Sequence, residues 1–342
     1  MRYLISQFED MSLRTKMFIF YAAVLLASLS VFAILTIRIS SEGIVEKATK
    51  NAERELSLIN NSLLNLTQNA EGYVSILTTD NRLQNQLERV KTDKEDSLDN
   101  IETVKTLSTA ISNVVKPNTY ISAASIISSK HKLFDIGFVD NSSIYPVIST
   151  KVTNLVAQNK TPIWTGLIKI KYKFFVGDDN VFAIAKTIIG MDTGHNLGIA
   201  ILYLKEKDIA SIYMDNMVNQ DVKFFILDDQ RKIISTQDKD ELYRKFDEKR
   251  YLGDYKLEEV SNVKSLIRNI GGSKELITVQ DFKKLNWKIV SVIPLKEITY
   301  EKKGMTKLIV IFGVTCLICA FAASYLLSYT PCLIILIVNP FL

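Results

Sequence analysis

Few residues in this 342-residue chain could carry out chemistry on a substrate. Its two histidines, His131 in "SKHKLFD" and His195 in "DTGHNLG", do not belong to a Cys/His ligand set. Asp228 and Asp229 are adjacent carboxylates, but neighbours on a strand point to opposite faces, so we interpret them as turn residues. The sequence has no G-x-S-x-G, no H-E-x-x-H and no glycine-rich phosphate loop. We therefore predict that the chain is not an enzyme and holds no metal or cofactor.

The positions of the cysteines and of the charged residues argue against further classes of function. Cys316, Cys319 and Cys332 all lie in the C-terminal apolar stretch. Cys316 and Cys319 form a C-x-x-C, but apolar packing on one helix face is a better interpretation than a redox or metal site. The net charge of +5 is small for this length, and lysines and acidic residues are interleaved. Because we find no basic cluster with aromatic residues between, we do not expect nucleic acid as a partner.

Two apolar runs are each long enough to cross a membrane. Residues 17–37 and residues 308–327 contain no charged side chain, and about 20 such residues cross ~30 Å of hydrocarbon. A cleaved signal peptide is the alternative for the first run, but its apolar core is too long and no small-x-small site follows it. We therefore predict two transmembrane helices with residues 38–307 between them.

The charges beside these runs leave the orientation open. Arg14 and Lys16 precede the first run and favour a cytoplasmic N-terminus, whereas Lys303 and Lys307 precede the second and favour the reverse. A loop as long as residues 38–307 is translocated largely regardless of its charge, so the positive-inside rule does not decide. We expect this segment to lie outside the plasma membrane.

An apolar stripe predicts a long helix over residues 38–78. Its residues recur at steps of three and four, as on one helix face: Val45, Ala48, Ala52, Leu56, Ile59, Leu63, Leu66, Ala70, Tyr73 and Leu77. The repeat is close to 3.5 residues, so the stripe could pair with a second copy in a coiled coil. It could equally pack along its own domain, and both interpretations stay open.

Two series of short β-rich runs follow the helix. The first is expected at 121–128, 134–140, 166–176, 181–189 and 197–204, with a helix at 205–218 after it. The second is expected at 222–229, 231–237, 274–282 and 287–294, with a short helix in "DKDELYRKF". "GDDN" at 177–180 suits a hairpin turn between two strands of the first series. The pattern predicts two strand-rich modules, the second smaller.

In order and spacing, these segments resemble the sensor half of YesM-type two-component sensor histidine kinases, which carry a double Cache (PAS-like) domain outside the membrane. "MSLRTKMFIFY" is similar to that family's entry into its first span. "TPIWTG" and "VFAIAKTIIGMDTGHNLGIAILYLKEKDIASIY" are similar to its distal module. "VKFFILDDQRKIISTQDKDEL" and "LNWKIVSVIPLKEI" are similar to its proximal module. The likeness covers residues 11–327.

The resemblance implies an α+β membrane protein in which two transmembrane helices flank a tandem PAS-like domain with a long N-terminal helix. The expected layout is a cytoplasmic N-terminus at 1–16, a transmembrane helix at 17–37, a long extracytoplasmic helix at 38–78, a distal module at 79–218, a proximal module at 219–298, a linker at 299–307, a second transmembrane helix at 308–327 and an apolar tail at 328–342.

The chain departs from the family after the second span. Where the family continues into a charged HAMP segment and a kinase, this sequence reads "SYTPCLIILIVNPFL". Pro331 breaks the helix there, and the residues after it are too few to span a membrane. His131 and His195 also lack the family's phosphoacceptor context. We expect a truncated kinase gene or, alternatively, a short form whose tail lies at the membrane interface.

The resemblance also suggests a ligand site, because PAS-like domains hold small molecules between the sheet and its covering loops. Six distal residues are candidates: Phe134, Tyr145, Trp164, Tyr172, Lys186 and Asp192. Core packing is the alternative for Trp164, and a sheet-edge position is the alternative for Lys186. The amino-acid-binding members have an Arg just before the Trp and a Tyr after it. Trp164 is instead flanked by "TPI" and "TG", which argues against amino-acid ligands.

We predict from these features the extracytoplasmic signal-sensing module of a two-component sensor in the cell membrane. It would form a homodimer, bind an unknown small ligand and transmit the signal through the second transmembrane helix, without its own catalytic domain. The alternative is a membrane-anchored scaffold or interaction protein whose PAS-like modules are structural. Saturable binding of a small molecule would favour the sensor.

Overall fold

The computed structural model describes residues 13–89, 98–117, 120–136, 161–171, 177–215, 222–259, 262–298, 307, 310–319 and 322. The chain divides into two compact units. The larger unit is Asn51–Ile293 and contains both β-sheets. The other unit joins Met1–Lys50 with Pro294–Leu342.

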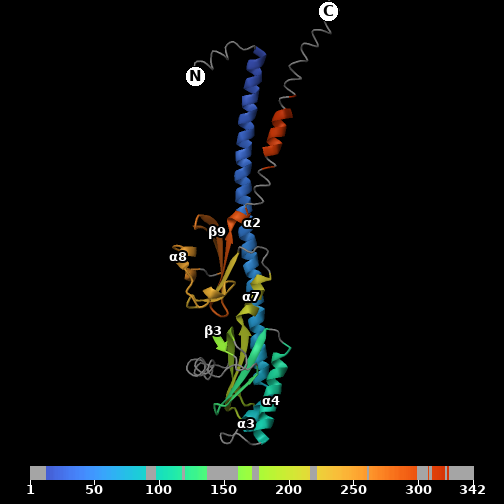
Figure 1. Ribbon diagram of the computed structural model, residues 1–342, viewed down its shortest axis with the longest axis vertical. Helices are drawn as coiled ribbons and strands as arrows, with labels where there is room; N and C mark the ends of the chain where they lie inside the picture. The colour runs from blue at the N-terminus through green and yellow to red at the C-terminus, as the bar shows by residue number, and fades with distance from the viewer. Residues whose placement is uncertain are drawn as a thin grey trace, which may run out of the picture. The chain divides into compact units, whose positions relative to one another are not determined.

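The long N-terminal helix expected from the apolar stripe is present as α2 (Leu13–Thr78), and its C-terminal part runs along both sheets (Figure 1). Beyond residue 50, the stripe is buried except for the half-buried Tyr73, and most of it joins the core that includes both sheets. Leu56, for example, has no exposed surface. This part of the stripe therefore packs along its own domain, and the part with Val45 and Ala48, which does not belong to that core, remains the candidate for pairing with a second copy. The homodimer itself stays a prediction.

The two transmembrane helices also stay predictions. Among the described residues, the structure contains no helix that is both long and apolar enough to cross a membrane. Residues 310–319, within the second predicted span, are helical. The apolar tail at 328–342 lies outside the described residues.

The distal sheet has five antiparallel strands in the order β2-β1-β5-β4-β3. The strands are β1 (Ile121–Ser128), β2 (Leu133–Ile136), β3 (Ile163–Lys171), β4 (Asp178–Ile189) and β5 (Asn196–Lys205). The helices α3 (Asn81–Arg89) and α4 (Leu98–Val115) bury leucines and an isoleucine in the same core as one face of this sheet. The helix α7 (Glu206–Met214) follows β5.

The proximal sheet repeats this arrangement in the order β7-β6-β10-β9-β8. The strands are β6 (Lys223–Leu227), β7 (Ile233–Thr236), β8 (Val263–Ile270), β9 (Ser273–Phe282) and β10 (Trp287–Pro294). Short helices connect them: η2 (Lys239–Glu241), α8 (Glu248–Tyr251) and η3 (Leu257–Glu259), with α9 (Leu295–Ile298) after β10. Counted within its own module, each sheet has the strand order 2-1-5-4-3, so one topology occurs twice.

The structure corrects two details of the sequence analysis. First, the strand β8 and the helices α3 and α4 were not predicted. Second, Asp178, Asp179 and Asn180 belong to β4 rather than to a turn. The hairpin between β3 and β4 is present, with Lys171 paired to Asp178. Ion pairs with strand neighbours hold these acidic residues in the sheet, since Asp178 lies 2.7 Å from Lys169 and Asp179 lies 2.6 Å from Lys205.

Asp228 and Asp229 lie in the turn between β6 and β7, as predicted. The Asp228 carboxylate accepts hydrogen bonds from the backbone N–H groups of Gln230 and Lys232, at 2.9 and 2.8 Å. A short aspartate side chain commonly stabilises a turn in this way.

Candidate functional site

The six candidate ligand residues do not form one group. Tyr145 and Tyr172 lie outside the described residues. Phe134 is 8% exposed and belongs to the core that the distal sheet forms with the helices. Asp192 lies in the exposed turn after β4. Trp164 on β3 and Lys186 on β4 both contact α2, as described next.

Trp164 and Lys186 attach the distal sheet to neighbouring turns of α2. The indole Nε1 of Trp164 donates to Glu71 Oε1 at 2.9 Å, and Lys186 Nζ donates to Ser75 Oγ at 2.9 Å. Glu71 and Ser75 are four residues apart, so they lie on one side of the helix. Lys186 is therefore explained by a contact with the helix, and its role in binding a ligand stays a prediction.

Glu71 connects the two modules. While its Oε1 accepts from Trp164 of the distal sheet, its Oε2 accepts from Lys284 Nζ at 2.8 Å, in the turn between β9 and β10. Both partners of the ion pair are about three-quarters buried, with side-chain exposures of 26% for Glu71 and 23% for Lys284. One carboxylate on α2 thus holds a donor from each module.

An aromatic cluster lies at the same junction. Trp287, the first residue of β10, contacts Trp164 edge to face, with ring centroids 6.2 Å apart. Its centroid is also 5.3 Å from Phe182 of the distal sheet and 5.9 Å from Phe282 of the proximal sheet. Such contacts add to the burial of each ring. A movement of β10 would therefore shift Trp287 against side chains of both modules.

A second connection joins α7 to the proximal sheet through buried polar groups. Glu206, 2% exposed, accepts from Ser235 Oγ at 2.6 Å and from Lys239 Nζ at 2.7 Å. Ser235 Oγ also lies 2.9 Å from the hydroxyl of Tyr213. Burial raises the pKa of Tyr213 well above its usual value, so this hydroxyl stays protonated. The contacts of Glu206 and Tyr213 therefore fix α7, the helix between the two sheets, near both of its ends.

The distal sheet has a second face, opposite the helices, with its own small core. The residues buried there come from the strands, and among the described residues no helix contributes to it. Its centre is lined by small side chains, Ala123, Ala183 and Ala185. The strand register places Ser125 beside Ile201 on this face, and Ile201 beside Ala185.

Ser125 is the unusual residue of this face. It has no exposed surface, and its Oγ has no hydrogen-bond partner among the described residues. Most buried hydroxyl groups in proteins are hydrogen-bonded, so one that is not calls for an explanation. Alanines and isoleucines surround the Ser125 hydroxyl, and Tyr203 lies on the same face. Such a face suits a small molecule with an aliphatic part and a hydrogen-bonding group.

Sequence reasoning missed Glu71, Lys284, Trp287 and Ser125. A signal existed for Trp287, because the chain has two tryptophans and this one begins an apolar strand. Glu71 lies on a helix among many polar residues, and its partners are 93 and 213 residues away. No feature of the neighbouring sequence distinguishes Glu71 from the other polar residues of the helix.

The fold of this chain is that of the sensory, ligand-binding domains of chemoreceptors and sensor histidine kinases, the double Cache type. The extracellular domain of vpHK1S-Z8, assigned as a histidine kinase, matches with a TM-score of 0.56 at 12% identity, over 76% of this chain and 96% of that one. No protein-family model and no curated protein matches the sequence.

Two chemoreceptor domains are similarly close. The ligand-binding domain of Campylobacter jejuni Tlp3, in complex with 4-methylisoleucine, matches with a TM-score of 0.54 at 15% identity, over 75% of this chain and 94% of that one. The ligand-binding domain of Pseudomonas fluorescens CtaA, in complex with L-isoleucine, matches with a TM-score of 0.53 at 9% identity, over 77% and 98%. At these identities the likeness establishes the fold alone.

Proposed function

We propose that this chain is the extracytoplasmic sensing module of a membrane receptor of the two-component kind, and that a small molecule binds on the distal-sheet face that carries Ser125. The observation that carries the proposal is the buried, unpartnered hydroxyl of Ser125 on an alanine-rich face. A ligand that donates to or accepts from this hydroxyl would satisfy it.

The route of the signal follows from the connections between the modules. The distal sheet holds α2 through Trp164 and Lys186, and the proximal sheet holds the same helix through Lys284. The strand β10 lies in the middle of the proximal sheet, between β6 and β9, and the chain continues from it into α9. A shift of the distal sheet against α2 would therefore reach β10 through Trp287 and Glu71.

In this proposal the chain is anchored by the two apolar runs at 17–37 and 308–327, with residues 38–307 outside the cell. It contributes binding and transmission and has no catalytic residue of its own. Phosphoryl transfer would belong to a separate domain or protein on the cytoplasmic side.

The ligand class follows from the chemistry of the Ser125 face and from the relatives. CtaA binds L-isoleucine and Tlp3 binds 4-methylisoleucine, and the side chains of this face are aliphatic apart from Ser125 and Tyr203. The amino-acid-binding members have an Arg just before the Trp, and Trp164 has none before it. This argues against their usual contacts with an amino acid. We therefore expect a branched aliphatic compound, and L-isoleucine and its amine-free analogue 3-methylpentanoate are the first two probes.

Thermal unfolding of the full chain in lipid nanodiscs tests the proposal. A bound ligand at 100 times its Kd stabilises the folded state by about 2.7 kcal/mol, which is a shift of several degrees in Tm. Ser125→Ala should weaken the binding about fivefold to tenfold, since one hydrogen bond contributes ~1 kcal/mol. Ser291→Ala is the matched control, because Ser291 Oγ in the proximal sheet is equally buried and unpartnered.

A wider panel of small branched acids, alcohols and amino acids follows if both first probes fail. If no compound shifts Tm saturably, the scaffold alternative is favoured. If a compound binds equally well to the wild type and to Ser125→Ala, binding occurs elsewhere and the proposed face is wrong.

A further inference from the structure

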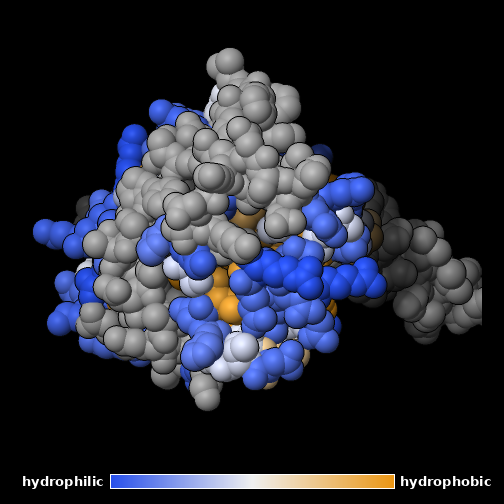
Figure 2. Space-filling view, turned by 90° about the horizontal axis from the view of Figure 1, so that it is seen from below, coloured by the Kyte–Doolittle hydropathy of each residue, from blue (hydrophilic) through white to orange (hydrophobic). Residues whose placement is uncertain are grey.

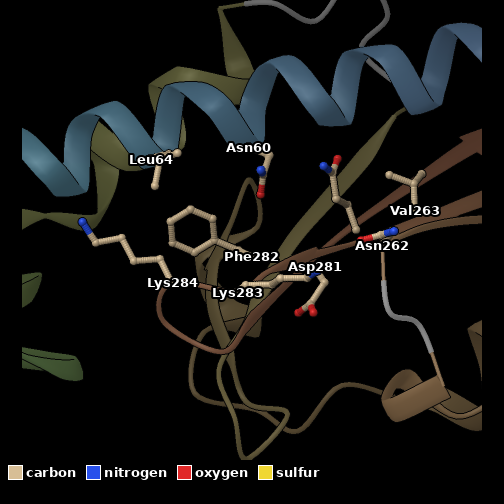
Figure 3. Close-up of a pocket in the computed structure, with 9 residues that line it drawn as sticks. Asn60, Leu64, Asn262, Val263, Asp281, Phe282, Lys283 and Lys284 are labelled. Carbon is tan, nitrogen blue, oxygen red and sulfur yellow. The ribbon is translucent and has the colours of Figure 1, made fainter.

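A pocket of about 430 Å³ lies in the proximal module, between α2 and the strands β8 and β9 (Figure 3). Asn60 and Leu64 extend from α2 into it, and Phe282 lies on the opposite side (Figure 3). Val263 and Gln280, which are paired in the register of β8 and β9, complete the interior. Its volume is within the range of ordinary ligand sites, about 300 to 1,000 Å³.

Two amide oxygens in this pocket lack hydrogen-bond partners among the described residues. Asn60 Oδ1 and Gln280 Oε1 are both buried without a partner among the described residues, and Gln280 is 9% exposed. One of them comes from the helix and the other from the sheet. Two buried, unsatisfied acceptors on facing sides of one cavity are unusual in a folded protein. A bound molecule that donates hydrogen bonds to both would explain them.

The charged groups around the pocket indicate an uncharged ligand. Lys284 is paired with Glu71 at 2.8 Å, and Asp281 is paired with Lys288 at 3.2 Å. The remaining charged residue of the lining, Lys283, is exposed. The groups that face the interior are therefore amides and apolar side chains. A charged ligand would lose its hydration there without gaining an opposite charge.

Phe282 and Leu64 define the rest of the chemistry. Phe282 is 2% exposed, and its ring centroid lies 5.9 Å from that of Trp287. An apolar wall beside amide groups suits a molecule with hydroxyl groups at its edges and carbon at its faces. A hydroxyl group both donates and accepts, so it can satisfy an amide in either orientation.

We propose that this pocket is a second ligand site, which takes a small uncharged polyhydroxyl compound such as a monosaccharide or a cyclic polyol. The site is separate from the Ser125 face and does not depend on it. Because it lies between α2 and β9, a compound bound here would draw the helix and the proximal sheet together. It would act on the same helix that carries Glu71, and so on the junction between the modules.

Tryptophan fluorescence gives a direct readout. The chain has two tryptophans, and Trp287 contacts Phe282 of the pocket wall. In a Trp164→Phe variant, the tryptophan emission comes from Trp287 alone. The full chain in lipid nanodiscs, with no sugar-based detergent present, is titrated with D-glucose, D-ribose and myo-inositol. We expect at least one of the three to change the emission saturably.

Near-isosteric substitutions test the two amides. Asn60→Leu and Gln280→Met keep the size of each side chain and remove its hydrogen-bonding groups. Each should weaken binding at least tenfold and leave Tm equal to or above the starting value, because each removes an unsatisfied buried group. Asn65→Leu is the matched control, since Asn65 is exposed on the same helix and should bind as the parent does.

Three results would overturn the proposal. In the first, none of the three compounds gives a saturable change. In the second, the change persists in both Asn60→Leu and Gln280→Met. In the third, Ser125→Ala abolishes it, which would place the compound on the distal face. Should a variant melt below the parent, amide hydrogen exchange of β8 and β9 in the unsubstituted chain decides instead, and protection by the compound is then the expected result.

Discussion

The two modules share one strand order and both bury apolar side chains of α2, but they differ in the polar part of this contact. Leu56 and Ile59 are buried near the proximal contacts, and Val74 and Leu77 belong to the apolar seam near the distal ones. In the distal module the two polar contacts with α2, made by Trp164 and Lys186, are complete hydrogen bonds.

The proximal module has a polar seam, in which Glu53 accepts from Ser265 at 2.9 Å and Ser265 lies 3.1 Å from the hydroxyl of Thr278. Asn60 and Gln280 continue this polar seam.

The difference teaches how one topology supports two roles. Separating the apolar side chains of α2 from either sheet exposes them to water at about 25 cal/mol per Å². The proximal contact also contains two buried oxygens without partners among the described residues, Asn60 Oδ1 and Gln280 Oε1, which gain hydrogen bonds when water enters. We therefore expect the proximal sheet to adjust against α2 more readily than the distal sheet does.

One end of the molecule shows its surface clearly. Seen from the end at which α3 and α4 lie, the described surface is mostly hydrophilic, with a small hydrophobic patch (Figure 2). The seams with α2 are interior, and substitutions inside them test the comparison between the modules directly.

The largest effect is expected from Leu77→Asn, which places an amide in the apolar seam. Leu77 is 1% exposed, and the change removes apolar burial and leaves a polar group without a partner. We expect the distal module to lose about 3 to 5 kcal/mol of stability. Hydrogen exchange of β1, β4 and β5 measures the loss for this module by itself.

Leu58→Asn is the control for this prediction, since Leu58 on the same helix is 61% exposed. It should change stability by less than about 0.5 kcal/mol. Equal effects of the two substitutions would show that the distal seam is not the apolar contact described here. The comparison between the modules would then fail.

The contacts with α2 also explain how much of the fold could be predicted from the sequence. The apolar stripe of α2 and the strands of the distal sheet were predictable, because their burial leaves a period in the sequence. β8 was missed because its side toward α2 carries Ser265, and Lys264 and Arg268 interrupt any apolar alternation. The signal that remained was Gly271–Gly272, a glycine pair with positive φ at both positions that marks the hairpin.

The site was harder to predict than the fold. Phe134, Trp164 and Lys186 were chosen for residue type, and all three belong to the side of the sheet that faces the helices. A shift of one residue moves a side chain to the other face of a strand, so the face can be assigned only once the register is known. Ser125 shows this, because it lies among apolar neighbours in "ISAASIIS" and looks like an ordinary strand residue.

A smaller effect is expected from Glu71→Gln, which acts on the connection between the modules. The amide can still accept from Trp164, but it no longer carries the charge that pairs with Lys284. We expect a loss of about 1 to 2 kcal/mol, the contribution of a partly buried, charge-assisted hydrogen bond. A double-mutant cycle with Lys284→Met, measured by urea unfolding, isolates the pair.

Glu46→Gln serves as the comparison, since the Glu46–Lys50 pair on the same helix has side-chain exposures of 68% and 72%. This substitution should leave the unfolding curve unchanged. A coupling energy between Glu71 and Lys284 that is indistinguishable from zero would remove Glu71 from the signal route. The aromatic contacts of Trp287 would then remain as the connection.

The smallest effect concerns Tyr243, whose hydroxyl donates to Asn180 Oδ1 of the distal module at 2.7 Å. Burial, followed by the charges of Glu206 and Asp178, raises the pKa of Tyr243 to about 12. In the unfolded chain a tyrosine ionises near pH 10. Between these two values the folded state keeps a proton that the unfolded state has lost, so stability present below pH ~10 falls as the pH rises toward ~12.

Tyr243 is 41% exposed, so solvent screens the effect and we expect a change in stability of less than about 1 kcal/mol. Tm measured from pH 9 to pH 11.5 should fall less steeply for Tyr243→Phe than for the wild type, because phenylalanine has no proton to lose. Other tyrosines contribute equally to both curves, so their difference reports Tyr243 alone. Parallel curves would show that the contact between Tyr243 and Asn180 opens before the hydroxyl ionises. The modules would then depend on Glu71 and Trp287 for their connection at high pH.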